Sequence, residues 1–264
     1  MHKTVLDFFG FSRLPFSKSL APKELFPAHS YTEAYARLEY GIGSEDFLLL
    51  TGPIGVGKSV VLAALMHSLD SNLYTPIYIR GNNLGEGELY KAILAALDRQ
   101  PPRYTQPARA MFFSVVSELS RKPIALIDDA QEMKDAALLS LKSLANFASD
   151  SQPRISFVLS GQPELRARLK LTQYLPLKQR IRLFYHMKPL SLEECCRYID
   201  HHTRIAGNPN PLFSDAAKAE IHRHADGIPR IVNTICYRSL IAATIKKLKL
   251  IDSEDLFLED PAEA

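Results

Sequence analysis

Several residue types and patterns are scarce in this 264-residue sequence. It has no tryptophan, and its three cysteines, Cys195, Cys196 and Cys236, form no C-x-x-C pair. So small and odd a number predicts no disulfide framework and is typical of a reducing compartment. No apolar run approaches the roughly 18 residues that a membrane span needs, and the first residues lead into no secretory signal. We therefore expect a cytoplasmic protein without a membrane segment.

Charge is nearly balanced overall but is unevenly distributed. The sequence has 32 Lys and Arg against 29 Asp and Glu, a formal net charge of +3. Between positions 154 and 188 the only acidic residue is Glu164. The basic residues of that stretch are Arg154, Arg166, Arg168, Lys170, Lys178, Arg180, Arg182 and Lys188. Such a stretch could contact double-stranded DNA, the acidic face of a neighbouring subunit, or solvent.

Short apolar runs alternate with helical patterns up to residue 188. The runs typical of strands are 47–51, 76–80, 123–128, 155–160 and 181–187, and the helical patterns between them are 60–69, 86–97, 108–119 and 136–148. This alternation predicts an α/β domain with a parallel sheet and helices on both of its faces. Three prolines within residues 99–107 predict a loop. The later patterns at 192–206, 215–225 and 229–248 are all helical and predict a small helical domain.

These patterns divide the chain into four expected parts. Residues 1–40 form an N-terminal segment packed on the core, with the aromatic residues of positions 8–16 against the sheet. Residues 41–188 form the α/β domain and residues 189–250 form the all-helical lid. Residues 251–264 form an acidic tail.

The most specific motif is a glycine-rich loop. The residues Gly52, Pro53, Ile54, Gly55, Val56, Gly57, Lys58 and Ser59 fit G-x-x-x-x-G-K-[ST], between a predicted strand and a predicted helix. The glycines allow backbone N–H groups to surround phosphates, and the helix that continues through Val60 directs its N-terminus at their negative charge. Lys58 is expected to bind the β- and γ-phosphates of ATP, and the Ser59 hydroxyl to bind Mg²⁺.

A second motif places two carboxylates after a buried strand. Residues 124–127 are four apolar residues, and Asp128 and Asp129 follow them directly. Asp128 is predicted to hold the metal, directly or through water. Asp129 is predicted to orient or deprotonate the water that attacks the γ-phosphate.

Together, five segments in order resemble one family. The segments TGPIGVGKS, ALIDDAQ, SFVLSGQPELRARL, QRIRLFYHMKPLSLEE and GIPRIVNTIC are similar to those of the AAA+ ATPases of the ExeA/GspA-like and TniB/TnsC-like group. The resemblance implies that Ser160 or Gln162 is the sensor 1 residue that detects the γ-phosphate. It implies that Arg180 is the arginine finger offered to a neighbouring subunit, although ordinary surface charge would also explain this residue. Arg230 is implied to be the sensor 2 arginine of the lid.

One position departs from the family pattern. The group commonly has glutamate after the metal-binding aspartate, whereas this sequence has Asp129. Because aspartate is one methylene shorter, we expect slow ATP hydrolysis. The resemblance also implies a homo-oligomer, a ring or a filament, that forms with nucleotide.

Three functions remain open. The first is a transposition regulator that assembles on double-stranded DNA and activates a transposase or another recombination protein. The short acidic end of the sequence, without a membrane anchor, favours it. The second is the ATPase domain of an ExeA/GspA-type secretion assembly protein, and the third is a replication initiator or helicase-loader switch. The loop at residues 81–86 has no basic residue, which counts against DNA binding there.

Overall fold

The computed structural model describes residues 2–17, 20–44, 47–145 and 154–258. The chain divides into two compact units, and we describe each by itself. The helical unit comprises Met1–Thr32, Ile54–Gly57 and Lys188–Ala264. The sheet unit comprises Glu33–Pro53 and Lys58–Met187.

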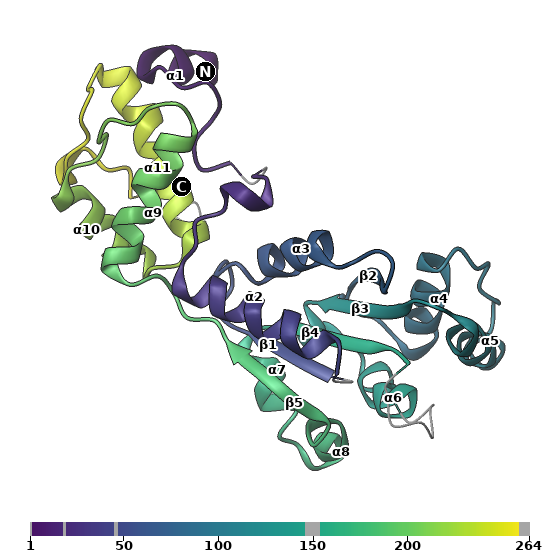
Figure 1. The fold of residues 1–264 in the computed structure, drawn as a ribbon. Helices are drawn as coiled ribbons and strands as arrows, with labels where there is room; N and C mark the ends of the chain where they lie inside the picture. The colour runs from purple at the N-terminus through teal and green to yellow at the C-terminus, as the bar shows by residue number, and fades with distance from the viewer. Residues whose placement is uncertain (1, 18–19, 45–46, 146–153, 259–264) are drawn as a thin grey trace. The chain divides into compact units, whose positions relative to one another are not determined.

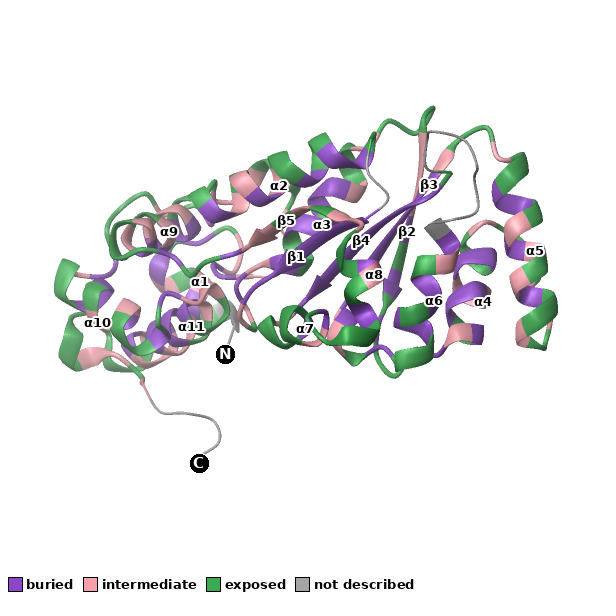
Figure 2. Cartoon of the chain, turned by 90° about the horizontal axis from the view of Figure 1, so that it is seen from below, coloured by how far each residue is buried: buried purple, intermediate pink, exposed green. Residues whose placement is uncertain are grey.

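A five-stranded parallel sheet forms the centre of the sheet unit. Its strands are β1 (Phe47–Thr51), β2 (Tyr74–Arg80), β3 (Lys122–Asp128), β4 (Ser156–Gly161) and β5 (Ile181–His186). Their order across the sheet is β2-β3-β4-β1-β5, and all neighbouring pairs are parallel (Figure 1). β1 and β4 are buried along their whole lengths (Figure 2), as strands covered on both faces must be. The predicted parallel α/β architecture is confirmed.

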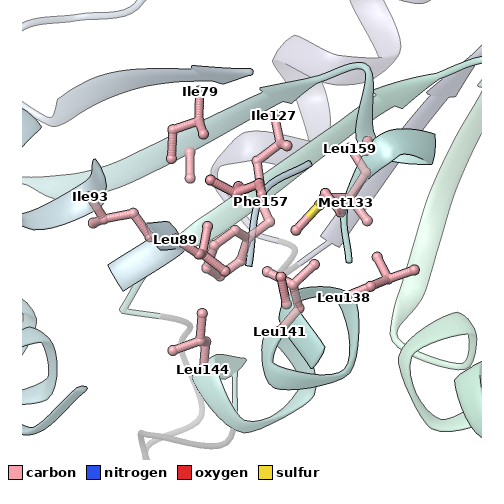
Figure 3. Close-up of a cluster of buried hydrophobic side chains, with 14 of the residues drawn as sticks. Ile79, Leu89, Ile93, Ile127, Met133, Leu138, Leu141, Leu144, Phe157 and Leu159 are labelled. Atoms are coloured by element: carbon pink, nitrogen blue, oxygen red, sulfur yellow. The ribbon is translucent and has the colours of Figure 1, made fainter. Parts of the chain in front are cut away.

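Helices cover both faces of this sheet. The helices of the unit are α2 (His29–Ile42), whose first turn belongs to the helical unit, α3 (Lys58–Ser68), α4 (Glu86–Ala96), α5 (Thr105–Glu118), α6 (Asp135–Ala145), α7 (Pro163–Arg168) and α8 (Leu175–Lys178). Leu89 of α4 and Leu141 of α6 pack in one cluster with Ile127 and Phe157 of the sheet (Figure 3). On the other face α2 lies so close that a Cβ on Gly41 would be 2.3 Å from Leu48.

The alternation of side chains along the strands positions the candidate site. Ile79, Ile127 and Leu159 face the cluster of Figure 3. Because successive strand residues point to opposite faces, the neighbouring positions 78, 128 and 160 point to the other face. That face carries α3, which begins with the lysine and serine of the glycine-rich loop.

Apart from Ile54–Gly57, the helical unit is built from the two ends of the chain. It contains α1 (His2–Phe9), α9 (Leu192–Ile205), α10 (Asp215–Ala225), α11 (Pro229–Lys246) and the short 3-10 turns η1 (Pro22–Glu24) and η4 (Ser253–Asp255). A capping box begins α9: Ser191 Oγ accepts a hydrogen bond from Glu194 N, and Ser191 N donates to the Glu194 carboxylate. Each bond satisfies a backbone or side-chain group at the helix start.

The N-terminal segment corrects one expectation. Phe9, Phe11 and Phe16 are buried in the same cluster as Ile199 and Val232 of the helical unit, whereas the sequence placed these aromatic residues against the sheet. Three hydrogen bonds explain this packing, because they satisfy carbonyl groups of the segment and of the end of α9. Ser12 N donates to Ala206 O (2.8 Å), Arg13 Nε to Ile205 O (3.2 Å) and Asn208 Nδ2 to Phe9 O (2.7 Å). Residues 1–32 therefore belong to the helical unit.

The expected tail also differs in its described part. Ile251 is fully buried, and its carbonyl accepts a hydrogen bond from Ser214 N (2.9 Å). Phe257 N donates to Ser239 Oγ of α11 (3.0 Å). Residues 251–258 thus pack on the helical unit because their apolar side chains and backbone groups find partners there. Residues 259–264 lie outside the described part of the chain.

Helix α5 begins earlier than the sequence predicts. α5 begins at Thr105, inside the predicted loop of residues 99–107. Pro107 fits in the first turn, where no helical partner needs its missing N–H. α6 is described to Ala145, and the predicted extension to residue 148 lies outside the described residues. No helix in the described part of the chain is both long and apolar enough to cross a membrane.

Candidate nucleotide-binding site

The glycine-rich loop connects the end of β1 to the start of α3. Gly55 has φ +83° and Gly57 has φ +113°. These are left-handed backbone conformations that glycine adopts without a steric penalty and that other residues rarely adopt. Gly52 N donates to Gly161 O (3.2 Å), which fixes the beginning of the loop to the end of β4. The backbone conformation at positions 55 and 57 therefore explains why both residues are glycine.

Lys58 lies over this loop. Its side chain is buried, and Nζ donates hydrogen bonds to Gly52 O (2.8 Å) and Pro53 O (2.9 Å). A buried ammonium group needs such acceptors. The two bonds hold a positive charge beside the glycine-rich loop.

Asp128 is the centre of a network of hydroxyl groups. It is only 4% exposed. Oδ2 accepts hydrogen bonds from Ser59 Oγ (2.6 Å) and Tyr78 OH (3.0 Å), and Oδ1 accepts from Ser160 Oγ (2.8 Å) and from Asp129 N (3.1 Å). Hydroxyl groups from β2, β4 and α3, together with the N–H of Asp129 just after β3, thus fix both oxygens of this carboxylate.

The residues of this centre fit Mg²⁺. Hydroxyl and carboxylate oxygens are hard donors, and Mg²⁺ takes one or two protein ligands together with phosphate oxygens and water. Ser59 and Asp128, the two predicted metal ligands, have their oxygens 2.6 Å apart. The donors on Asp128 are groups of the kind that orient a metal ligand from behind.

Tyr78 is a site residue that the sequence did not indicate. Tyrosine is common in strands, so its presence in a strand pattern does not indicate a functional role. Only the pairing of Tyr78 with Leu126 of β3 places its hydroxyl near Asp128. Partial burial, followed by the charge of Asp128, raises the pKa of Tyr78. The phenol therefore stays protonated at neutral pH and can donate to the carboxylate.

The two candidates for sensor 1 lie at the end of β4 and differ in their contacts. Ser160 is fully buried and its side chain bonds Asp128. Gln162 reaches the neighbouring loop with its backbone, because its N–H donates to Gln131 Oε1 (3.0 Å). The structure thus brings the Ser160 side chain into the network. Which of the two detects the γ-phosphate stays a prediction.

Asp129 has an unusual backbone conformation. Its φ is +52°, in the left-handed region where aspartate is found more often than most residues. The adjacent loop fits closely, since a Cβ on Gly81 would lie 2.5 Å from Asp129 O. The carboxylate accepts a hydrogen bond from Gln131 Nε2 (3.2 Å). Its role in activating water stays a prediction.

The two predicted arginines lie in different units. Arg180 is half-buried between α8 and β5, and its backbone N donates to Leu177 O (3.0 Å). Arg230 is exposed in the first turn of α11. Its backbone N donates to Gly55 O (3.3 Å) within the helical unit, where a Cβ on Gly55 would lie 2.7 Å from Arg230 Cβ. The roles of both arginines stay predictions.

The fold and the loop define the class of protein. Residues 42–169 match the family model described as AAA domain. The fold is similar to that of Cdc6p from Pyrobaculum aerophilum, with a TM-score of 0.73 and 20% identity over 91% of this chain and 68% of that one. It is also similar to the Holliday junction branch migration motor RuvB of Thermotoga maritima, with a TM-score of 0.59 and 20% identity over 86% of this chain and 66% of that one. The chain has the AAA+ fold, and its residues 42–169 are similar to an AAA domain.

One curated relative is more similar in sequence. General secretion pathway protein A of Aeromonas hydrophila is 34% identical over 245 residues. The match covers 90% of this chain and 44% of that protein. This chain therefore spans less than half the length of that relative.

Proposed function

We propose that this chain is an ATP-hydrolysing AAA+ protein that acts in the general secretion pathway. The network at Asp128 carries the hydrolytic part of the proposal, because it joins the serine of the glycine-rich loop to the carboxylate that would share its metal. The identity of 34% to General secretion pathway protein A supports the pathway.

Each residue of the site has a distinct task in this proposal. Lys58 and the backbone of the glycine-rich loop bind the phosphates of ATP, and Ser59 and Asp128 hold Mg²⁺. When bound, the metal neutralises charge on the β- and γ-phosphates. Asp129 orients the attacking water, and its short side chain keeps turnover at or below about 1 s⁻¹, the low end of ordinary enzymes.

Self-association completes the proposed mechanism. Arg180 of one copy contacts the nucleotide of its neighbour, and Arg230 contacts the nucleotide of its own copy. Guanidinium groups stabilise the charge that spreads over the γ-phosphate during transfer. ATP therefore favours a homo-oligomer, and hydrolysis releases it.

The secretion function has more support than the transposition function that the sequence suggested first. The named relative belongs to the general secretion pathway, and the 20% identity to Cdc6p and RuvB supports a common fold alone. The basic stretch is also partly engaged inside the protein. Arg168 Nη1 donates to Gln131 O (3.0 Å) and Met133 O (2.7 Å).

The hydrolytic part is tested by phosphate release from ATP with Mg²⁺. We expect slow release by the wild type and none above background from Lys58→Ala and Asp129→Asn. Light scattering should detect larger assemblies with a non-hydrolysable ATP analogue than with ADP. Wild-type turnover far above about 1 s⁻¹ would contradict the slow switch, and identical assembly with both nucleotides would contradict nucleotide-controlled association.

The pathway is tested in the source organism. Deleting the gene that encodes this chain should lower the amount of secreted protein in the medium, and the wild-type gene should restore it where Lys58→Ala does not. Duplex DNA binding, measured against salt with and without the ATP analogue, separates the alternatives. Unchanged secretion together with nucleotide-dependent, salt-sensitive DNA binding would favour the transposition function.

A further inference from the structure

Gln131 connects the candidate catalytic carboxylate to the end of β4. It lies in the short turn η2 (Ala130–Glu132), directly after Asp129. Its Nε2 donates to Asp129 Oδ1 (3.2 Å), and its Oε1 accepts from Gln162 N (3.0 Å). One side chain therefore joins the loop after β3 to the loop after β4.

The two partners determine how the amide group is oriented. A backbone N–H can only donate a hydrogen bond and a carboxylate can only accept one. Oε1 must therefore face Gln162 and Nε2 must face Asp129. No other side chain of this shape does both: glutamate would place a second carboxylate beside Asp129, and methionine would lose both hydrogen bonds.

The surroundings of Gln131 hold it in this position. A Cβ on Gly161 would lie 2.7 Å from Gln131 Oε1, so the side chain fits because residue 161 is glycine. Arg168 Nη1 donates to Gln131 O (3.0 Å) and fixes the backbone of the turn. The Arg168 guanidinium is itself held by Asp135.

From this arrangement we infer that Gln131 is the positioning residue of Asp129. Its amide holds Oδ1, so that the carboxylate presents Oδ2 as its second acceptor for the attacking water. The end of β4 then orients both acids of the site: Ser160 bonds Asp128 directly (2.8 Å), and Gln162 bonds Asp129 through Gln131. The inference rests on the proposed function, since it assigns a task in ATP hydrolysis.

The exact position of the catalytic carboxylate matters more for aspartate than for glutamate, whose side chain is longer. A carboxylate that must reach water from a shorter side chain has fewer geometries in which it can act. Misplacement of a catalytic group by about 1 Å can cost roughly 100-fold in rate. We therefore expect a large effect from a residue that need not touch the nucleotide.

The test compares Gln131→Met and Gln131→Glu with the wild type. We expect kcat for ATP hydrolysis to fall about 10- to 100-fold in Gln131→Met, and further in Gln131→Glu because two carboxylates face each other. KM and the affinity for a non-hydrolysable ATP analogue should change less than about twofold. The matched control is Gln106→Met, which makes the same replacement at an exposed position of α5, and its kcat should equal that of the wild type.

A second measurement needs no nucleotide. In a double-mutant cycle of Asp129→Ala and Gln131→Met, the changes in the unfolding equilibrium should be non-additive by about 3- to 10-fold. A wild-type kcat in Gln131→Met overturns the inference, and so does a loss of ATP affinity as large as the loss of kcat. If the wild type itself hydrolyses no ATP, the proposed function fails, and the cycle alone decides: additive changes overturn the positioning of Asp129, and non-additive changes support it.

Discussion

The two units of this chain differ in how their buried groups are satisfied. The sheet unit buries polar side chains in a connected network, in which Asp128 has donors on both oxygens. The helical unit buries a cluster of aromatic and aliphatic side chains from both chain ends. Nδ1 of its buried His202 has no hydrogen-bond partner in the described part of the chain. The hydroxyl and carboxylate groups around Asp128 can bind a ligand, whereas the buried aromatic and aliphatic cluster of the helical unit stabilises its fold.

The largest expected effect comes from deleting one core phenyl group in each unit. Phe9 and Phe157 are both buried, and Phe157 stacks on Phe47 with ring centroids 5.2 Å apart. We expect Phe9→Ala and Phe157→Ala each to lower the free energy of unfolding by about 3–5 kcal/mol. Hydrogen exchange followed by mass spectrometry should show faster exchange in α9 and α11 for Phe9→Ala, and in β1, β3 and β4 for Phe157→Ala.

Both variants also test whether the two cores are independent. Exposed Phe184 provides a control, because Phe184→Ala removes the same group from a position that buries less apolar surface. It should cost under about 1 kcal/mol, as surface substitutions usually do. If Phe9→Ala and Phe157→Ala accelerate exchange equally in both units, the chain unfolds as one cooperative body and the two cores are not independent.

The next effect is on binding and not on stability. Lys58 places a buried ammonium group at the glycine-rich loop. Lys58→Ala should weaken ATP binding about 100-fold, since a hydrogen bond between charged groups contributes up to about 3 kcal/mol. Binding of a fluorescent ATP analogue measures the change, and Lys142→Ala on the exposed side of α6 serves as the control. An unchanged affinity in Lys58→Ala would mean that the loop does not bind phosphate.

The sequence predicted the part of the site that depends on local pattern. Gly55, Gly57 and Lys58 were predicted because the loop motif is continuous in the sequence, and Asp128 because a buried strand ends at it. These residues lie where the structure forms a shaped loop and a fixed carboxylate. When the residues of a motif are adjacent in sequence, the local backbone alone determines how they are arranged.

The contacts that sequence reasoning missed depend on geometry between segments. The Tyr78 hydroxyl reaches Asp128 only because β2 pairs with β3 in a particular register. Gln131 meets Gln162 only because β3 and β4 are neighbours and residue 161 is glycine. The packing of Phe9 in the helical unit was missed for a similar reason, since Ile199 and Val232 of the same cluster lie far along the chain from Phe9. The short helix α7 was missed because six residues show too little periodicity to indicate a helix.

We expect the buried His202 to make the stability of the helical unit depend on pH. Burial, and then the charges of His201 and Arg13, lower the pKa of His202 from 6.5 to about 3. The folded state therefore binds fewer protons than the unfolded state between pH 6.5 and about 3. Stability from this group is unaffected above pH 6.5 and falls as the pH drops through that window, by about 2 kcal/mol at pH 5.

Denaturant unfolding at pH 7 and pH 5 measures this loss. His202→Phe keeps an aromatic ring against Phe16, whose ring centroid lies 5.1 Å away, and has no group to protonate. It should remove about 2 kcal/mol of the difference between the two pH values. His67→Gln, at an exposed position of α3, is the control and should retain the wild-type difference. Equal pH dependence in the wild type and His202→Phe would mean that His202 does not limit stability in acid.

The smallest expected effect tests whether the network of the sheet unit tolerates the loss of one member. Tyr78→Phe removes one of the two hydroxyl groups on Asp128 Oδ2 and leaves Ser59 in place. Because Tyr78 is 40% exposed, water can replace its hydroxyl, and we expect a loss of only about 0.5–1.5 kcal/mol in urea unfolding. Tyr104→Phe, at a more exposed tyrosine, should cost less.

A loss above about 3 kcal/mol in Tyr78→Phe would mean that Asp128 depends on Tyr78 as a buried charge depends on a sole partner. The sheet unit would then tolerate unsatisfied polar groups no better than the helical unit, and the difference between them would lie only in which groups are buried.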